Sequence, residues 1–229
     1  MATATLPATG TNPSPKKALF ITLGLLVAAA VIAVVVVLAT GGDSDTSPDA
    51  SEATRIPQGD VRQVSFAEVV GDPLPAYDPD AAVDAAIGAT APEFIASYFD
   101  NGETTVTPGD GQPKVVLFLA HWCPHCQAEV ELLSDMFATD GKPAGVEVIA
   151  VSTSVDQGAG NYPPSAWFLR EGWPLPVLRD SAQRDLAQGY GLNAFPFIVA
   201  VDGDGTVISR SSGGLSEVGW QSLFTSLQG

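Results

Sequence analysis

The longest apolar stretch of the chain runs from Ala18 to Thr40 and contains no charged residue. With a rise of 1.5 Å per residue, a helix of this length spans a hydrocarbon core of about 30 Å. Lys16 and Lys17 precede the stretch, and no acidic residue occurs before it, so the positive-inside rule places the N-terminus in the cytoplasm. We therefore expect residues 1–17 to be a cytoplasmic tail, followed by a single transmembrane helix and an extracytoplasmic remainder.

A cleaved secretory signal is the alternative interpretation of this stretch. Signal peptides have apolar regions of only about 7–15 residues, and Ala39-Thr40-Gly41 is a weak cleavage site. Residues 41–89 are expected to be a linker and N-terminal extension. The first part is rich in Gly, Ser, Asp, Thr and Pro, which is typical of a flexible linker. Residues 61–70 within it predict a short strand or docking segment.

The compact domain is predicted over residues 90–229, and its centre is an amphipathic helix between two apolar runs. Residues 115–120 and 146–152 have the continuous apolar character of strands buried on both faces. Residues 127–137 between them predict a helix, and its apolar face is formed by Cys126, Val130, Leu133 and Phe137. The acidic residues expected largely off that face are Glu129, Glu131 and Asp135. Strand, helix and strand of these lengths predict a right-handed crossover and a parallel strand pair.

Shorter elements are expected around this centre. An edge strand is predicted at 94–99, a short strand at 177–179, a hairpin of strands at 197–201 and 206–210, and helices at 165–172, 182–190 and 217–227. Ser216 is the expected N-cap of the last helix. The fold class is therefore α/β with a mixed central sheet.

The charge balance excludes one class of partner. The net charge is −16 and the isoelectric point about 4.1, with no basic runs, so a nucleic-acid backbone is a poor partner. Both cysteines and both histidines of the chain lie within residues 121–126. Two cysteines are too few for a disulfide scaffold, and four groups this close in sequence cannot converge tetrahedrally on a metal. We expect no metal and no cofactor other than a redox-active Cys123–Cys126 disulfide.

The two cysteines are expected to differ in chemistry. Pro124 suits the first turn of a helix, so the helix begins near Cys123, where free N–H groups and the helix dipole favour a thiolate. Cys123 is therefore predicted to be the exposed nucleophile, and Cys126, on the apolar face, the shielded resolving thiol. His125 is predicted to stabilise the Cys123 thiolate, which would make the disulfide a stronger oxidant. An inert structural disulfide is the alternative.

Trp122-Cys123-Pro124-His125-Cys126 after a buried strand resembles the active site of the thioredoxin fold. The Cys-Pro-His-Cys form is similar to that of DsbA-type disulfide oxidases, and the resemblance covers about residues 90–229. It implies that Pro196 is a cis proline facing the cysteines, that the backbone of Phe195 binds substrate, and that Trp122, Pro124 and His125 tune the site. An ordinary trans proline at the start of a strand is the alternative for Pro196.

The chain departs from the resemblance in two places. Thioredoxins have a buried aspartate where this chain has Leu117, so the proton acceptor for Cys126 is not identified. The segment 153–195 is shorter than the helical insertion of DsbA proteins and more like the membrane-tethered TlpA/ResA group, many of which are reductases.

The sequence thus predicts a membrane-tethered extracytoplasmic enzyme that exchanges disulfides with protein substrates, with a DsbA-like oxidase as the main interpretation. A quinone-linked membrane partner would reoxidise it. The first alternative is a TlpA/ResA-like reductase supplied with electrons across the membrane. The second is a non-catalytic binding module that uses the Pro196 groove and the region of Trp167 and Trp173.

Three further features have competing interpretations. Trp167, Phe168 and Trp173 predict core packing or, alternatively, a substrate patch. His121 is either a tuning group or a solvated neighbour of the site. Asp202-Gly203-Asp204-Gly205 faintly resembles a calcium loop but predicts a hairpin turn, since it lacks the remaining ligands.

Overall fold

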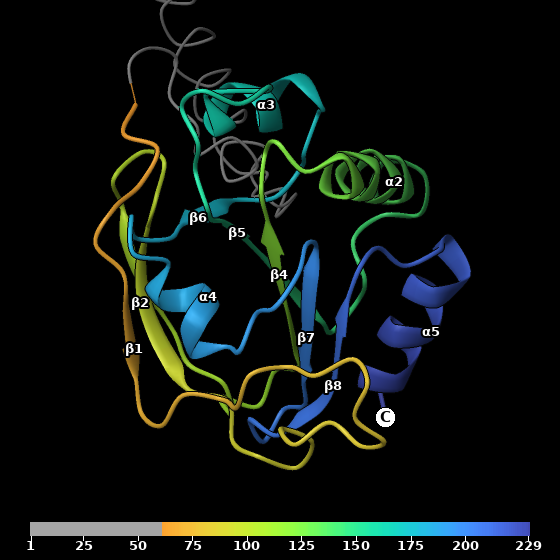
Figure 1. Ribbon diagram of the computed structural model, residues 1–229. Coiled ribbons are helices and arrows are strands. Elements are labelled where there is room, and N and C mark those ends of the chain that lie inside the picture. The colour runs from red at the N-terminus through yellow and green to blue at the C-terminus, as the bar shows by residue number, and fades with distance from the viewer. Residues whose placement is uncertain (1–60) are drawn as a thin grey trace, which may run out of the picture. The chain divides into compact units, whose positions relative to one another are not determined.

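The computed structural model describes residues 61–229 (Figure 1). The predicted tail (1–17), transmembrane helix (18–40) and most of the predicted linker lie outside the described residues. Between residues 61 and 229, every helix is too short or too polar to cross a bilayer.

One mixed sheet forms the centre of the described domain. Its strands are β1 (Glu68–Val70), β2 (Glu93–Tyr98), β3 (Glu103–Val106), β4 (Lys114–Leu119), β5 (Glu147–Ser152), β6 (Val177–Arg179), β7 (Phe197–Val201) and β8 (Val207–Ser212). Its helices are α2 (Pro124–Asp140), α3 (Pro164–Arg170), α4 (Asp185–Gly189) and α5 (Glu217–Leu227). The strand order is β1-β2-β6-β5-β4-β7-β8, with β3 also paired to β2. The prediction of an α/β domain with a mixed sheet is confirmed.

Strand β4 lies in the middle of the sheet and is buried along its whole length. It pairs in parallel with β5 and antiparallel with β7, so the predicted β4-α2-β5 crossover is confirmed. Alternate residues of β4 enter different cores. Leu117 and Leu119 pack with α2, α3 and α5 on one face, and Val116 and Phe118 pack with α4 and the N-terminal extension on the other.

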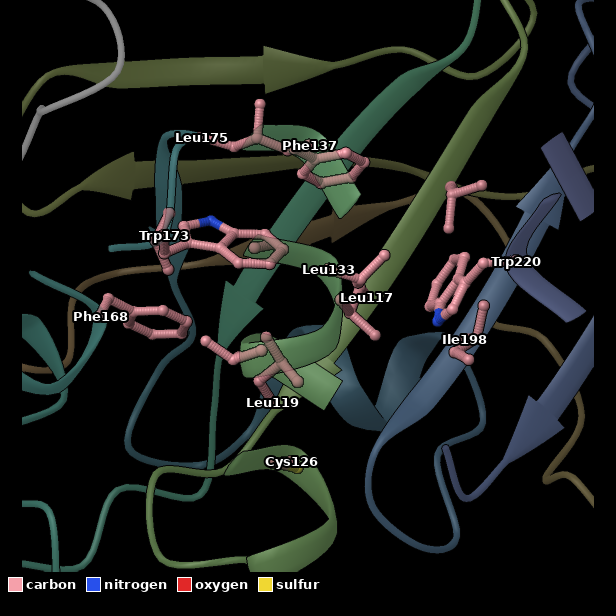
Figure 2. Close-up of a cluster of buried hydrophobic side chains, with 14 of the residues drawn as sticks. Leu117, Leu119, Cys126, Leu133, Phe137, Phe168, Trp173, Leu175, Ile198 and Trp220 are labelled. Carbon is pink, nitrogen blue, oxygen red and sulfur yellow. The ribbon is translucent and has the colours of Figure 1, made fainter. Parts of the chain in front are cut away.

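The aromatic residues 167, 168 and 173 belong to the first of these cores, and their expected core packing is confirmed. All three side chains are buried, so they do not form a surface patch. Figure 2 shows Phe168 and Trp173 in the cluster with Leu117 and Trp220, and Cys126 at the margin of the same cluster. The active-site helix is thus fixed by the largest apolar side chains of the domain.

The strand pairing tests two local predictions, the edge strand at 94–99 and the hairpin at Asp202. The strand predicted at 94–99 is confirmed as β2, but its expected edge position is wrong, because β2 pairs with β1, β3 and β6. The short strand β3 (Glu103–Val106) was not predicted, because turn residues lie on both sides of it. The hairpin at Asp202 is confirmed, since its carboxylate Oδ1 accepts hydrogen bonds from the backbone N–H groups of Asp204 and Thr206.

We expect Gly191→Ala to lower the free energy of unfolding by about 2–4 kcal/mol. Gly191 has a φ of +75°, and an added Cβ would collide with the carbonyl oxygen of Pro75 and the guanidinium of Arg210. Gly172→Ala is the matched control, because Gly172 has a φ of +66° with nothing within 4 Å of the added Cβ. It should lose only about 1 kcal/mol. Urea unfolding followed by tryptophan fluorescence measures both, and equal losses would refute the steric account.

Candidate active site

Cys123 and Cys126 flank the first turn of α2, as the sequence predicted. Cys123 is the N-cap residue, with φ of −80° and ψ of 119°, and Pro124 occupies the first helical position. Both cysteines are thiols in this structure. Cys126 is fully buried, and Cys123 is only 7% exposed. The expectation of an exposed Cys123 is therefore wrong, because the loop before β7 covers it and the carbonyl oxygen of Phe195 lies 3.9 Å from its Sγ.

The thiol of Cys126 is held at the end of β4. The backbone N–H of Ala120 donates to its Sγ at 3.4 Å. Burial raises the pKa of the Cys126 thiol far above its ordinary value, and the hydrogen bond from Ala120 opposes this only in part. The neighbouring charges of Cys123 and Glu129 raise that pKa further. Cys126 therefore stays protonated until a base removes its proton.

Phe195 and Pro196 precede β7, and the carbonyl oxygen of Phe195 lies next to Cys123. The Phe195–Pro196 peptide bond is cis, as the resemblance implied; a second cis bond, Tyr162–Pro163, was not anticipated. The ring of Phe195 packs edge-on against Trp122, with centroids 5.7 Å apart. Trp122 remains 38% exposed, and its Nε1–H donates to the carbonyl oxygen of Ser154 at 2.8 Å. The cis-proline loop and Trp122 thus form the exposed rim around Cys123.

The two histidines have different roles in the structure. His125 is exposed, and within residues 61–229 no hydrogen bond joins it to Cys123, so its tuning role stays a prediction. His121 is buried, so the interpretation as a solvated neighbour is wrong. Its Nε2 accepts from the backbone N–H of Asp156, which leaves Nδ1–H to donate to the carbonyl oxygen of Gly160 at 2.8 Å. His121 therefore fastens the loop after β5 to the active site.

The burial of Glu129 is the largest departure from the sequence prediction. It was expected off the buried face of α2, but it is only 3% exposed. Its Oε1 accepts hydrogen bonds from the backbone N–H of Leu215 at 3.1 Å and from Nε1–H of Trp220 at 2.5 Å. Burial raises the pKa of the Glu129 carboxyl, and both hydrogen bonds oppose that shift. The i, i+3 spacing from Cys126 was the available signal, but the donors come from residues far along the chain.

Asp180 is the other carboxylate near this end of the sheet whose pKa burial raises. It accepts hydrogen bonds from Thr153 Oγ1 and from the backbone N–H groups of Ser181, Leu186 and Ala187. These bonds tie β5, β6 and α4 together, so the carboxylate is committed to the fold. Leu117 is buried core and supplies no acid. Glu129 is the carboxylate whose charge acts on Cys126.

The non-catalytic binding module, the second alternative function, was expected to bind proteins partly through the region of Trp167 and Trp173. Trp167, on α3, and Trp173, just after that helix, are both buried in the core, so they cannot line a groove for a bound protein. The part of the site that stays accessible lies instead around Trp122 and Phe195.

Comparisons with known proteins identify relatives of this arrangement. The sequence model of the AhpC/TSA family matches residues 87–210. The chain is 32% identical over 161 residues to the thiol:disulfide interchange protein DsbE homolog of Paracoccus denitrificans, which covers 66% of this chain and 79% of that protein. It is 27% identical over 122 residues to the thiol-disulfide oxidoreductase ResA of Geobacillus thermodenitrificans, covering 53% of this chain and 67% of the relative.

A solved structure supports the fold assignment. The thiol:disulfide interchange protein of the thioredoxin family from Chlorobium tepidum superposes with a TM-score of 0.52 at 20% identity. The match covers 64% of this chain and all of that one. The thioredoxin-like fold is thereby confirmed for the described domain.

Proposed function

The chain belongs to the AhpC/TSA family, as a thioredoxin-fold thiol–disulfide oxidoreductase of the ResA/DsbE type, and we propose that it reduces disulfides of proteins outside the cytoplasm. One observation carries the chemistry: Cys123 caps α2, Cys126 lies in its first turn, and the carbonyl oxygen of Phe195, at the cis Phe195–Pro196 bond, lies 3.9 Å from the Sγ of Cys123. A nucleophilic thiol at a helix N-terminus with a buried second thiol is the arrangement that thiol–disulfide exchange requires.

Two features favour reduction over oxidation. Strong oxidants of this class hold their reduced form as a stabilised thiolate. Here the Sγ of Cys123 approaches a carbonyl oxygen, which accepts a hydrogen bond from a thiol but repels a thiolate. The similar proteins carry ResA and DsbE names. The main prediction, a DsbA-like oxidase, is therefore not supported, and we adopt the reductase alternative.

The proposed reaction conserves atoms and electrons. The Cys123 thiolate attacks one sulfur of a substrate disulfide and expels the other as a thiolate, giving a mixed disulfide. Cys126 loses its proton and attacks the Cys123 sulfur, releasing the second substrate thiol. The substrate gains two electrons and two protons, and the enzyme is left with a Cys123–Cys126 disulfide. A dithiol donor, which itself receives its electrons across the membrane, then reduces this disulfide and is left as a disulfide.

Glu129 is the proposed proton acceptor for Cys126. Its carboxylate is buried on the same helix face, three residues away, and its charge already acts on that thiol. The bonds from Leu215 and Trp220 both use Oε1, whereas Oε2 lies against Gly214, where a Cβ would collide with it. Oε2 is thus the oxygen left to take the proton. Glu129 would thus accept the proton of Cys126, which Leu117 cannot do.

We expect Glu129→Gln to slow resolution of the mixed disulfide roughly 10²-fold while leaving the attack by Cys123 nearly unchanged. Glutamine can keep both bonds to Oε1 but cannot accept the proton. Stopped-flow measurement of the two phases checks this, and Glu131→Gln, on the exposed side of α2, is the control of equal charge change. Equal slowing of both phases would contradict the proposal.

The Glu129 pKa also fixes the sign of a stability effect. Its folded-state pKa lies above the ordinary value of 4.5, so its contribution to stability is present below about pH 4.5 and lost as pH rises. Glu129→Gln should therefore gain stability relative to the parent between acid and neutral pH. A constant difference in unfolding free energy over that range would contradict a raised pKa.

The proposed location rests on the sequence. The charge-free stretch at 18–40 after Lys16 and Lys17 favours a membrane anchor with the catalytic domain outside the cytoplasm. Thiols and disulfides of exported proteins are the substrates that such a position offers.

The direction of exchange can be tested with the full chain in a non-ionic detergent. The dithiol form should accelerate reduction of insulin disulfides when dithiothreitol is the electron source. The disulfide form should give little oxidative refolding of a reduced, unfolded disulfide protein. Faster oxidation than reduction would overturn the reductase proposal and restore the oxidase.

A further inference from the structure

A groove of about 1320 Å³ opens beside the candidate active site. Trp122, which precedes Cys123, and Phe195, whose carbonyl oxygen lies near its Sγ, are among the lining residues. The other walls come from residues 61–66, from the loop after β5 with Tyr162, and from residues 182–184. An extended segment bound against Trp122 and Phe195 therefore lies beside the residues that flank the reactive thiol.

The wall made by residues 61–66 is held firmly. The carbonyl oxygen of Arg62 accepts from Nη1 of Arg179 at 2.8 Å, and the backbone N–H of Ser65 donates to the carbonyl oxygen of Asp180. The buried side chain of Gln63 accepts from the backbone N–H of Ser165 at 3.0 Å. These bonds use backbone atoms and Gln63, so the side chain of Arg62 is free to meet a ligand.

Positive charge gathers at the groove although the domain is strongly acidic. Residues 61–229 contain seven basic and 21 acidic side chains. Four of the basic side chains are buried or paired: Lys114, Arg170, Arg179 and Arg210. The other three, Arg62, Lys142 and Arg184, have no ion-pair partner within residues 61–229. Arg62 and Arg184 line the groove, and among the described lining residues (61–229) Asp156 is the only acidic one.

Exposed aromatic side chains accompany these charges. Phe66 is 65% exposed, and Trp122 and Tyr162 are exposed as well. All three line the groove. Aromatic faces bind apolar side chains, and arginines bind carboxylates with paired hydrogen bonds. The groove thus suits an extended polypeptide that carries both.

We propose that the groove binds the segment flanking the reactive cysteine of a substrate protein and selects segments with acidic residues beside apolar ones. This rests on the proposed reductase function and names its substrate class. Arg62 and Arg184 are the specificity-determining residues. Arg62 belongs to the segment 61–66, which Arg179 and Asp180 hold in place.

The test uses two disulfide-bonded reporter peptides that differ only in the flanks of the cysteine, Asp/Glu in one and Lys in the other. The reduced full chain in non-ionic detergent should reduce the acidic peptide about three- to tenfold faster at low salt. The preference should shrink in about 0.5 M NaCl, because the Debye length falls below about 5 Å. Arg184→Glu and Arg62→Glu should each cut the preference at least about twofold, and Arg184→Lys should keep it.

Lys142→Glu is the matched control. It makes the same charge change at an exposed cation outside the groove and should leave the preference intact. Equal rates for the two peptides would overturn the proposal, as would an equal effect of Lys142→Glu and Arg184→Glu. Loss of activity on both peptides and on a small aromatic disulfide would instead show that the reductase function itself has failed.

The acidic linker of the same chain is the competing occupant. If it filled the groove, the intact chain would show no preference, and replacing Asp43, Asp45, Asp49 and Glu52 by their amides would create one. That result would overturn the proposal. A preference already present in the intact chain, unchanged by these amides, supports it.

Discussion

Replacing Cys123 by serine lowers the rate of disulfide reduction by at least about 10³-fold on our account. A serine hydroxyl stays protonated at neutral pH and cannot attack a disulfide sulfur. Cys126 cannot take over, because it is fully buried and its thiol has a raised pKa. Turnover of insulin by the full chain measures the loss, and a residual rate within tenfold of the parent would refute the assignment of the nucleophile.

Cys126→Ser is the matched variant and has a different expected outcome. It keeps the Cys123 thiol and a side-chain acceptor for the N–H of Ala120, but it removes the resolving thiol. We therefore expect a mixed disulfide with substrate to accumulate, visible by non-reducing electrophoresis and reversed by dithiothreitol. If Cys123→Ser trapped substrate and Cys126→Ser did not, the two roles would be exchanged.

Replacing Arg210 by methionine should cost about 3–5 kcal/mol of unfolding free energy. Its side chain is fully buried, and its guanidinium forms two hydrogen bonds with the carboxylate of Asp84. It also donates to the carbonyl oxygens of Pro75 and Tyr190 and stacks near Phe197, the residue after cis-Pro196. Methionine fills much of the volume, but it removes the guanidinium donors of two carbonyl groups and leaves the half-buried Asp84 carboxylate with only the backbone N–H of Ala86 as a donor.

The size of the Arg210 effect depends on pH in a definite direction. The side-chain hydrogen bond to Arg210 lowers the pKa of Asp84 below its ordinary value of 3.8. The contribution of the pair is therefore present above about pH 4 and is lost as pH falls through the lowered pKa. Denaturant unfolding at pH 7 and near pH 3 should show a smaller difference between variant and parent at the lower pH. Arg170→Met, at an exposed pair with Glu171, should change stability by less than about 0.5 kcal/mol.

The elements with strong local signals were predictable from the sequence. The apolar run before the cysteines gave β4, and the spacing of Cys126, Val130 and Leu133 gave the buried face of α2. Ser216 was identified as an N-cap, and its hydroxyl oxygen accepts from the N–H of Gly219. The cis state of Pro196 followed from the resemblance and not from any local pattern.

The features that were missed depend on partners far along the chain. Glu129 is buried because Trp220 and Leu215, about ninety residues later, donate to it. His121 is buried because a loop that begins after β5 closes over it. Cys123 is covered by Phe195 of the cis-proline loop. A helical wheel shows which face a residue occupies but not what later segment will meet it.

The reduction potential of the Cys123–Cys126 pair distinguishes a reductase from an oxidase. The full chain in non-ionic detergent would be equilibrated with dithiothreitol buffers of defined potential and the fraction of dithiol measured by thiol alkylation. We expect a value near or below that of thioredoxin, about −270 mV, because no hydrogen bond within the described residues stabilises a Cys123 thiolate and burial keeps Cys126 protonated. A value near about −120 mV, as in strongly oxidising members of the fold, would contradict it.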